Sequence, residues 1–308
     1  MVTMFQRSVV AAALLVATMA ANRGPAKITA TDDRPRTITL SASPKRIVSL
    51  APATTEYLYA AGLGDRVVGI SDYCKFPPSV EGKRRVGSLT NPSLETIVAL
   101  KPDLVVAAKL NPLEALDRIE ALKIPVFGTD PKTLNAVLGC IARLARIGGT
   151  EKLAAEQLKP IRDRLARVKR QMAGLNPDHR PRVFYLLETD PIFTAGKGSI
   201  VDECIGLAGG LNLAADLPKP WGNFSMETLV ARDPEVLIVV GDDPVAAVRR
   251  VTEQEPKFQL LTAVKKNRII AFTSDFLGNP TPRAVEGMEK LAKFLHPQIF
   301  AAKPKEGQ

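Results

Sequence analysis

The sequence has few of the residues that carry metal and acid–base chemistry. Its 308 residues include two histidines, three cysteines and one tryptophan, and aromatic residues make up 5%. Neither His179 nor His296 has a Cys, Asp or Glu at metal-ligand spacing, so we expect no metal site and no histidine-based triad. A proline follows each histidine within two positions, which predicts that both lie in surface turns.

The motifs of common enzyme classes are also absent. The chain contains no G-x-S-x-G turn, no phosphate-binding P-loop and no C-x-x-C pair. We therefore expect no catalytic residues and no resident cofactor. An exported enzyme is the less favoured alternative.

The three cysteines are widely spaced, so at least one is unpaired within the chain. Cys140 and Cys204 fall in apolar, helix-like stretches and are expected to be small core residues. Cys74 falls in a loop and is the one candidate for a reactive thiol.

The charge is strongly basic, with 42 Lys and Arg against 32 Asp and Glu, or a net +10. The basic residues are scattered, and their densest run, from Arg162 to Arg170, is interleaved with Leu165 and Val168. That spacing is typical of the solvated face of a helix. We therefore expect no nucleic-acid partner.

The first 21 residues predict export. Arg7 precedes an apolar stretch, Val9 to Ala17, and small residues follow it up to Ala21. This is the pattern of a cleaved signal peptide, and it is too short for a stop-transfer helix. No cysteine ends the apolar stretch, so no lipid anchor is indicated, and the expected location is the periplasm.

The rest of the chain reads as two α/β lobes, because apolar strands and helices alternate at the spacing of parallel β-α-β units. The expected parts are a polar leader at 22–43 with a strand at 37–40, a first lobe at 44–149, a connecting helix at 150–175, a second lobe at 176–300 and a tail at 301–308. The expected strands are 46–50, 67–70, 125–128, 183–187, 236–240 and 268–272, and the expected helices are 54–61, 199–207, 226–231, 244–253 and 282–295. A helix and strand pair is also expected over 93–108, and a further helix before the strand at 125–128.

The connecting helix carries one apolar stripe, formed by Leu158, Ile161, Leu165, Val168 and Met172 at alternating steps of three and four. A helix of this length, with no partner helix adjoining it in the sequence, is suited to bridge two lobes. Pro160 is expected to kink or interrupt its first half. We expect lobe closure to be modest, because a long helix resists bending more than flexible strands do.

One unit occurs twice. NPSLETIVALKPDLVVA starts at Asn91 and NFSMETLVARDPEVLIVV at Asn223, and the two glutamates lie 132 positions apart, from 95 to 227. Ser93 and Ser225 are natural helix N-caps, so both glutamates fall in a first helical turn, where the dipole favours an acid. Either glutamate alone would be read as a helix stabiliser. The pair predicts one exposed carboxylate at the same corner of each lobe.

Five segments together resemble the helical-backbone class of substrate-binding proteins of ABC importers, and in particular its cobalamin-binding members. They are RIVSLAPATTEYLYAAGLGDRVVGISDYCKFPP (46–78), NPSLETIVALKPDLVVA (91–107), PIFTAGKGSIVDECIGLAGGLN (191–212), TSDF (273–276) and TPR (281–283). The resemblance covers about residues 44–295. It implies two lobes with a ligand cleft between them, and a monomer that delivers its ligand to a permease with an associated ATPase. It also implies that Glu95 and Glu227 dock on permease arginines.

The cleft is expected at the carboxyl ends of the strands, where parallel sheets bind ligands. Aromatic residues concentrate near these ends, as a large amphipathic ring ligand requires. The expected ligand-binding residues are Tyr73, Phe193, Trp221, Asp275 and Phe276, of which the resemblance assigns Tyr73, Trp221 and Asp275 to ligand contact.

Cobalamin or another corrinoid is the favoured ligand, with haem and iron–siderophore complexes as alternatives. Where cobalamin-binding members place two more tryptophans in the first lobe, this chain has Leu89 and Ala108. Haem would call for an axial ligand, for which Tyr73 is the main candidate. An anionic siderophore complex prefers a basic pocket, and Lys109 is the one cation that we place at a strand end.

Overall fold

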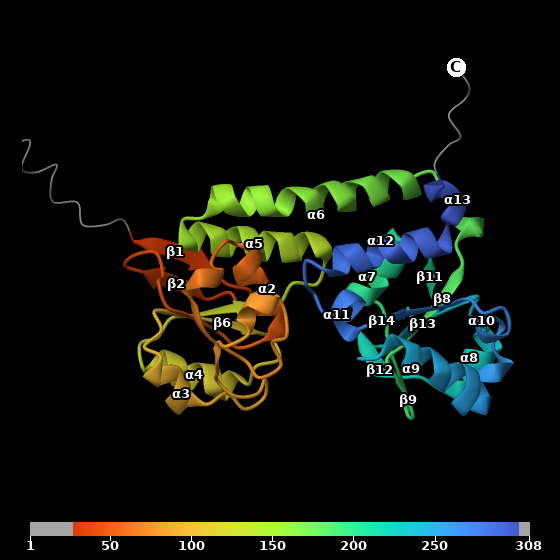
Figure 1. Ribbon diagram of the computed structural model, residues 1–308, viewed down its shortest axis with the longest axis horizontal. Helices are drawn as coiled ribbons and strands as arrows, with labels where there is room; N and C mark the ends of the chain where they lie inside the picture. Colours follow the sequence, from red (N-terminus) through yellow and green to blue (C-terminus); the bar gives the residue numbers. More distant parts are fainter. Residues whose placement is uncertain (1–26, 302–308) are drawn as a thin grey trace, which may run out of the picture.

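Two parallel β-sheets form the centres of two lobes in the computed structural model, which describes residues 27–301 apart from the side chains of Ser274 and Asp275. The expected signal peptide, and all but the first residue of the expected tail, lie outside the described residues. The long helix α6 runs across both lobes on one side (Figure 1). The predicted fold class, two α/β lobes joined by one long helix, is confirmed.

The first lobe is built on a five-stranded parallel sheet in the order β5-β4-β3-β6-β7. Its strands are β3 (Ile47–Ser49), β4 (Val67–Ile70), β5 (Arg84–Arg85), β6 (Leu104–Ala108) and β7 (Val126–Thr129), and its helices are α2 (Pro52–Ala60), α3 (Leu94–Ala99), α4 (Leu113–Ala121) and α5 (Leu134–Gly148). The first four residues of β6 are buried apolar residues, as in a strand covered by helices on both faces.

The second lobe has a four-stranded parallel sheet in the order β11-β8-β13-β14 and a small antiparallel sheet in the order β12-β10-β9. Its strands are β8 (Arg182–Leu186), β9 (Glu188–Thr189), β10 (Ile192–Ala195), β11 (Leu211–Asn212), β12 (Trp221–Asn223), β13 (Val236–Val240) and β14 (Ile269–Phe272). Its helices are α7 (Ile200–Leu207), α8 (Met226–Arg232), α9 (Pro244–Arg249), α10 (Thr262–Lys265), α11 (Ser274–Leu277), α12 (Ala284–Leu295) and α13 (Pro297–Phe300). A π-helical turn, Arg250–Gln254, continues α9.

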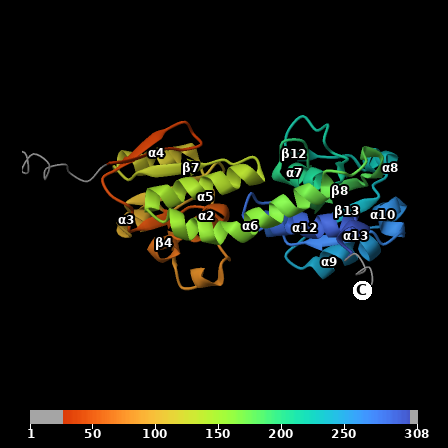
Figure 2. The same cartoon turned by 90° about the horizontal axis from the view of Figure 1, so that it is seen from above.

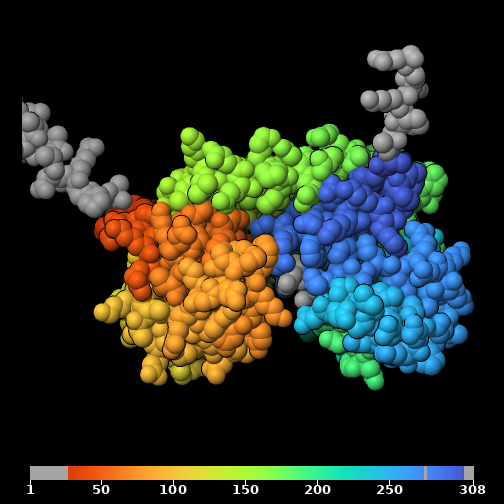
Figure 3. All heavy atoms as spheres, in the orientation of Figure 1, coloured from red at the N-terminus to blue at the C-terminus, as the bar shows by residue number. Residues whose placement is uncertain are grey.

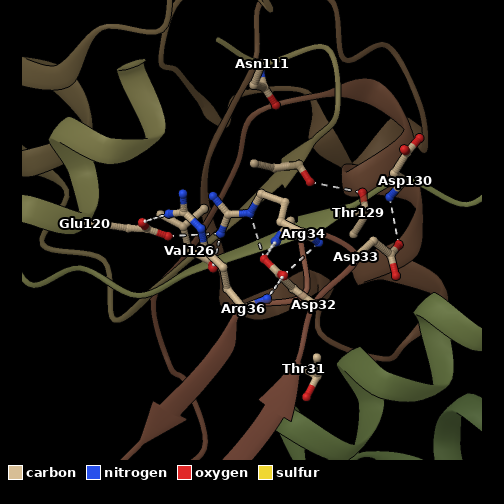
Figure 4. Close-up of polar contacts among 12 residues, drawn as sticks. Thr31, Asp32, Asp33, Arg34, Arg36, Asn111, Glu120, Val126, Thr129 and Asp130 are labelled. Atoms are coloured by element: carbon tan, nitrogen blue, oxygen red, sulfur yellow. Dashed lines mark hydrogen bonds and ion pairs between the residues drawn. The ribbon is translucent and has the colours of Figure 1, made fainter. Parts of the chain in front are cut away.

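The leader contains a β-hairpin, β1 (Ile28–Thr31) with β2 (Thr37–Leu40), where the sequence predicted one strand. Its turn covers the outer edge of β7 (Figure 4). The backbone N–H of Asp33 donates to the carbonyl of Gly128 at 3.0 Å, and the N–H of Gly128 donates to Oδ2 of Asp32 at 2.9 Å. Arg34 donates to the carbonyl of Val126 at 2.9 Å. The hairpin thus satisfies polar groups that an edge strand leaves open.

Helix α6 (Glu151–Met172) has 22 residues and is about 33 Å long at 1.5 Å per residue. Its buried side chains belong to one apolar cluster that extends into both lobes. Seen from above, α6 lies beside α5 in the first lobe and over α12 in the second (Figure 2). The sequence analysis described the stretch around Cys140 as helix-like but did not predict α5 as an element. The helix ends at Gly148, and its C-cap Gly149 has a φ of 66°. Therefore α6 does have a partner helix next to it in the sequence.

The predicted interruption at Pro160 is wrong, because α6 runs through this residue as one helix. Pro160 is exposed, and the helix on either side of it is held by the buried residues Leu158 and Leu165. Tertiary packing therefore outweighs the local preference of proline.

The prediction of a surface turn at His296 is also wrong. His296 follows α12 and is 2% exposed, and its Nε2 lies 3.1 Å from the carbonyl oxygen of Gly209. Gly209 has a φ of 83°, and a Cβ there would lie 2.6 Å from this nitrogen. The missing side chain leaves the space that the imidazole occupies. His179 is exposed, as predicted.

Glu289 of α12 joins the second lobe to α6. Its carboxylate lies 3.0 Å from Nε of Arg164 and 2.8 Å from Nη2 of Arg167, and Lys293 is 3.6 Å away. Burial favours the neutral acid, but the hydrogen bond from Arg167 and the charges of Lys293 and Arg164 outweigh it and hold the pKa of Glu289 below its ordinary value. The ionised carboxylate therefore stabilises the contact between α6 and α12.

We expect Glu289→Gln to lower the free energy of unfolding at neutral pH by about 1–3 kcal/mol, because two arginines lose a buried charged acceptor. Since the folded-state pKa lies below the ordinary 4.5, this stabilisation is present above that pH and is lost as the pH falls through the folded value. Thermal melts of the two proteins should differ near neutral pH and converge in acid. The matched control is Glu151→Gln, at an exposed position of α6. Melts that coincide at neutral pH would contradict the role of Glu289.

Candidate ligand-binding cleft

The carboxyl ends of the strands in both lobes border a space between the lobes, and Figure 3 shows the surface hollowed there. On the first-lobe side lies the loop after β4. Arg85 fixes this loop by donating to the carbonyls of Ser71 at 3.0 Å and Cys74 at 2.7 Å. Tyr73 is 59% exposed and Phe76 is 39% exposed, so both rings are available to a ligand.

Cys74 points the other way. Its side chain is buried, and its Sγ lies 3.1 Å from the hydroxyl of Thr55. Burial raises the pKa of this thiol. The prediction that Cys74 is a candidate reactive thiol is therefore wrong, because the loop turns the side chain into the core. Cys140 and Cys204 are buried, as predicted.

The second-lobe side carries an aromatic stack on the small antiparallel sheet. The rings of Phe193 on β10 and Trp221 on β12 are 6.4 Å apart and nearly parallel, with 8° between their planes. Tyr185 of β8 meets Trp221 edge-on at 6.0 Å. Trp221 is half-buried. Strand β12 lies on the side of the second lobe that faces the first (Figure 1).

Four side chains, two from each lobe, meet beside this space and join the lobes. Arg283, which precedes α12, forms two contacts with Glu56 of α2, from Nη2 to Oε1 at 2.5 Å and from Nε to Oε2 at 3.1 Å. The guanidinium lies 4.2 Å from the ring centre of Phe76 and 5.8 Å from that of Phe276. Glu56 is only 4% exposed. A buried carboxylate of one lobe is thus paired with an arginine of the other, between a ring from each lobe.

Further hydrogen bonds between the lobes lie near this pair. The hydroxyl of Tyr57 donates to the carbonyl of Pro280, and burial raises the pKa of Tyr57 well above its ordinary value. The N–H of Leu134, at the start of α5, donates to Oε2 of Glu203 on α7 at 2.6 Å. At the rim, Nζ of Lys75 lies 3.7 Å from Oδ2 of Asp242.

Lys109 is less available than the sequence suggested. Its Nζ lies 3.1 Å from Asp130 of the same lobe, which raises the pKa of Lys109. The cations that border the space also include Lys75 and Arg283, which the sequence analysis did not place there. Both are paired with carboxylates of the opposite lobe.

Sequence reasoning also missed two apolar residues at the strand ends. Asn111-Pro112-Leu113 follows β6 and Asp243-Pro244-Val245 follows β13, with the same offset of 132 positions as the repeated glutamates. Leu113 is 62% exposed and Val245 is 69% exposed. Continuing the alignment of the repeat past the two strands would have found them.

The remaining predicted residues lie as follows. Phe276 is on α11 beside Arg283. Asp275 is in the same helix, but its side chain lies outside the described residues. Glu95 and Glu227 are exposed in the first turns of α3 and α8, after the N-caps Ser93 and Ser225. Both helices lie at the end of their lobe that is remote from α6 (Figure 1).

Among the side chains that the structure describes, no group of three His, Cys, Asp or Glu is placed to hold a metal ion. Over the same part of the chain, no helix is both long enough and apolar enough to cross a membrane.

Comparison with known proteins places the chain in a family. A family model described as periplasmic binding protein matches residues 47–276. The vitamin B12-binding protein of Vibrio cholerae is 32% identical over 254 residues, which cover 82% of this chain and 89% of that protein. A Bacillus subtilis protein described as an uncharacterised ABC transporter substrate-binding lipoprotein is 31% identical over 278 residues, covering 89% of this chain and 87% of its own.

Solved structures of similar proteins support the same family assignment. The crystal structure of the Vibrio cholerae vitamin B12 binding protein superposes with a TM-score of 0.74 at 30% identity, covering 84% of this chain and 99% of that one. The apo form of a periplasmic haem-binding protein from Roseiflexus sp. RS-1 gives a TM-score of 0.72 at 29% identity, covering 83% and 99%. With two lobes, a connecting helix and a space bordered by strand ends, the chain belongs to the periplasmic binding protein family, in the class that serves ABC importers.

Proposed function

We propose that the chain binds cobalamin, or a closely related corrinoid, between its lobes in the periplasm and delivers it to the permease of an ABC importer, without catalysing a reaction. The observation that carries the proposal is the aromatic lining from both lobes: exposed Tyr73 and Phe76 on one side, and the Phe193–Trp221 stack on the other. Flat apolar surfaces with a few polar groups suit a large ring ligand. The likeness to vitamin B12-binding proteins supports the same ligand.

Haem is the second candidate. Tyr73 is the observation that favours it, because it is the most exposed aromatic side chain of the described residues and a tyrosine can serve as an axial iron ligand. The likeness to the Roseiflexus haem-binding protein is nearly as strong as that to the vitamin B12-binding protein. An anionic siderophore complex is the less favoured ligand, because it would need basic groups to bind it. Lys75, Lys109 and Arg283 are each already paired with a carboxylate of the protein.

Delivery rests on Glu95 and Glu227. Both carboxylates are exposed, and both helices lie at the end of the molecule remote from α6 (Figure 1). Two fixed negative charges on one side of the molecule suit a permease that presents two positive sites. We propose that these two helix starts make the first contact with the permease.

Cyanocobalamin should quench the fluorescence of Trp221, the single tryptophan, and raise the melting temperature by ligand linkage. Trp221→Ala should weaken binding, measured by calorimetry, by about tenfold, or ~1.4 kcal/mol. Trp221→Phe keeps a ring to stack on Phe193 and should bind nearly as tightly. Haemin, titrated in parallel, should bind more weakly. A response to haemin alone, lost in Tyr73→Phe, would reject the corrinoid in favour of haem.

Glu95→Ala combined with Glu227→Ala should leave cyanocobalamin affinity unchanged and abolish uptake of labelled cobalamin by cells of the source organism. The reason is that both side chains are exposed in the first turns of α3 and α8, and not in the loops that border the space between the lobes. The matched control is Glu151→Ala with Glu156→Ala, two exposed glutamates on α6. Normal uptake by the first double variant would refute the docking role.

A further inference from the structure

The repeated unit that begins at Asn91 and at Asn223 extends without a gap into the following helices, yet the two copies differ at their surfaces. In the first lobe, α3 and α4 enclose a groove of about 160 Å³. Its apolar side consists of Pro92, Leu94, Ile97, Pro112, Ala115 and Ile119, and its polar side of Thr90, Asn91, Glu114 and Arg118. Arg118 is paired with Glu114 at 2.6 Å. Glu95 is in the same helical turn as Leu94, and Val98, one turn further along α3, is 42% exposed.

The size of the groove decides what it fits. A volume of 160 Å³ is about five times the ~30 Å³ of one liquid water, and small-molecule pockets are larger, at about 300–1,000 Å³. The groove therefore suits one inserted side chain and not a free ligand. Ile97 and Ile119 are buried, whereas Glu114 and Arg118 are exposed. Protein interfaces hold an anchor residue in such a pocket, where buried apolar side chains are surrounded by polar ones.

The second lobe is closed at the corresponding positions. Phe224, the counterpart of Pro92, packs on Phe184 with ring centres 5.1 Å apart, and the guanidinium of Arg232 lies 5.3 Å over its ring. Ala247, the counterpart of Ala115, is 5% exposed and belongs to the core. Val230, the counterpart of Val98, packs against the same core.

We propose that the groove between α3 and α4 receives an apolar side chain from a permease loop that also presents a cation to Glu95, and that the second lobe docks through Glu227 without such an anchor. This inference rests on the proposed docking function. Its chemistry is an apolar side chain beside an Arg or Lys, which matches the buried apolar side of the groove and the exposed carboxylate of Glu95. Because only the first lobe would receive an anchor in this way, the protein would bind its permease in one preferred orientation.

The test is photo-crosslinking in cells of the source organism, because it does not depend on the ligand. Glu114→p-benzoylphenylalanine places a crosslinker at the rim of the groove, where the side chain is 78% exposed. The control is Glu156→p-benzoylphenylalanine, at an exposed position of α6. We expect position 114 to capture an ABC permease subunit, identified by mass spectrometry, and position 156 to capture none.

Filling the groove should then block the capture. Ala115→Phe should reduce the crosslink from position 114 about tenfold, or ~1.4 kcal/mol. Ala155→Phe, the same change at an exposed position of α6, should leave it unchanged. Val98→Asn, which makes the neighbouring surface polar without filling the groove, is the second variant, and the melting temperature checks the fold of each.

The outcomes separate this inference from the docking role of the glutamates. If Ala115→Phe and Val98→Asn crosslink like the parent while Glu95→Ala with Glu227→Ala does not, the groove proposal is wrong and the docking proposal stands. If the glutamate variant also crosslinks normally, both are wrong. If position 114 captures no permease subunit at all, the groove is not part of the interface.

Discussion

The distance between the lobes is set by α6, and the rest of the structure depends on that distance. The helix is one uninterrupted rod that packs on α5 in the first lobe and on α12 in the second. Its buried side chains form a core shared by both lobes, and its arginines hold Glu289 of α12. A pair of lobes fixed in this way can present a surface to a ligand from each side without first paying for a large rearrangement.

Direct contacts between the lobes beside the cleft also hold the lobes at a fixed distance. Glu56 and Arg283 form a buried pair across the lobes, and Phe76 and Phe276 cover its two sides. Separating the lobes would break both charge-assisted contacts between the Glu56 carboxylate and this arginine. The pair therefore restrains the lobes and holds two of the rings that border the cleft. The positions of these two rings and the separation of the lobes are linked through the four side chains.

Much of the fold followed from the sequence, because buried parallel strands are short apolar runs bounded by Gly, Pro and polar residues. Strands 67–70 and 236–240 were predicted with their observed bounds, and the exposed first-turn positions of Glu95 and Glu227 followed from the N-cap pattern. The short strands β9, β11 and β12 were not found, because two or three residues carry no readable period. The signals for α5 were present, a threonine N-cap and a terminal glycine, and were overlooked.

The site was less predictable, because its key contacts join residues far apart in the chain. Tyr73 and Trp221 stood out as aromatic residues near strand ends. Nothing local marked Glu56 as the partner of Arg283, 227 positions away, or showed that Cys74 turns inward towards Thr55. Likewise, Lys109 was visible as a cation at a strand end, but its pairing with Asp130 was not. Such pairings depend on how loops from separate units meet.

The rigidity of the two-lobe frame is most directly tested by the distance between spin labels placed on Val98→Cys and Ala231→Cys, one in each lobe. The native cysteines are buried, so the labels attach to the introduced residues. Electron-spin distance measurements should give one narrow distribution that shifts by only a few ångströms when cyanocobalamin is added. The account would be contradicted by a broad distance distribution in the free protein, or by a change in the label-to-label distance comparable to the width of a lobe.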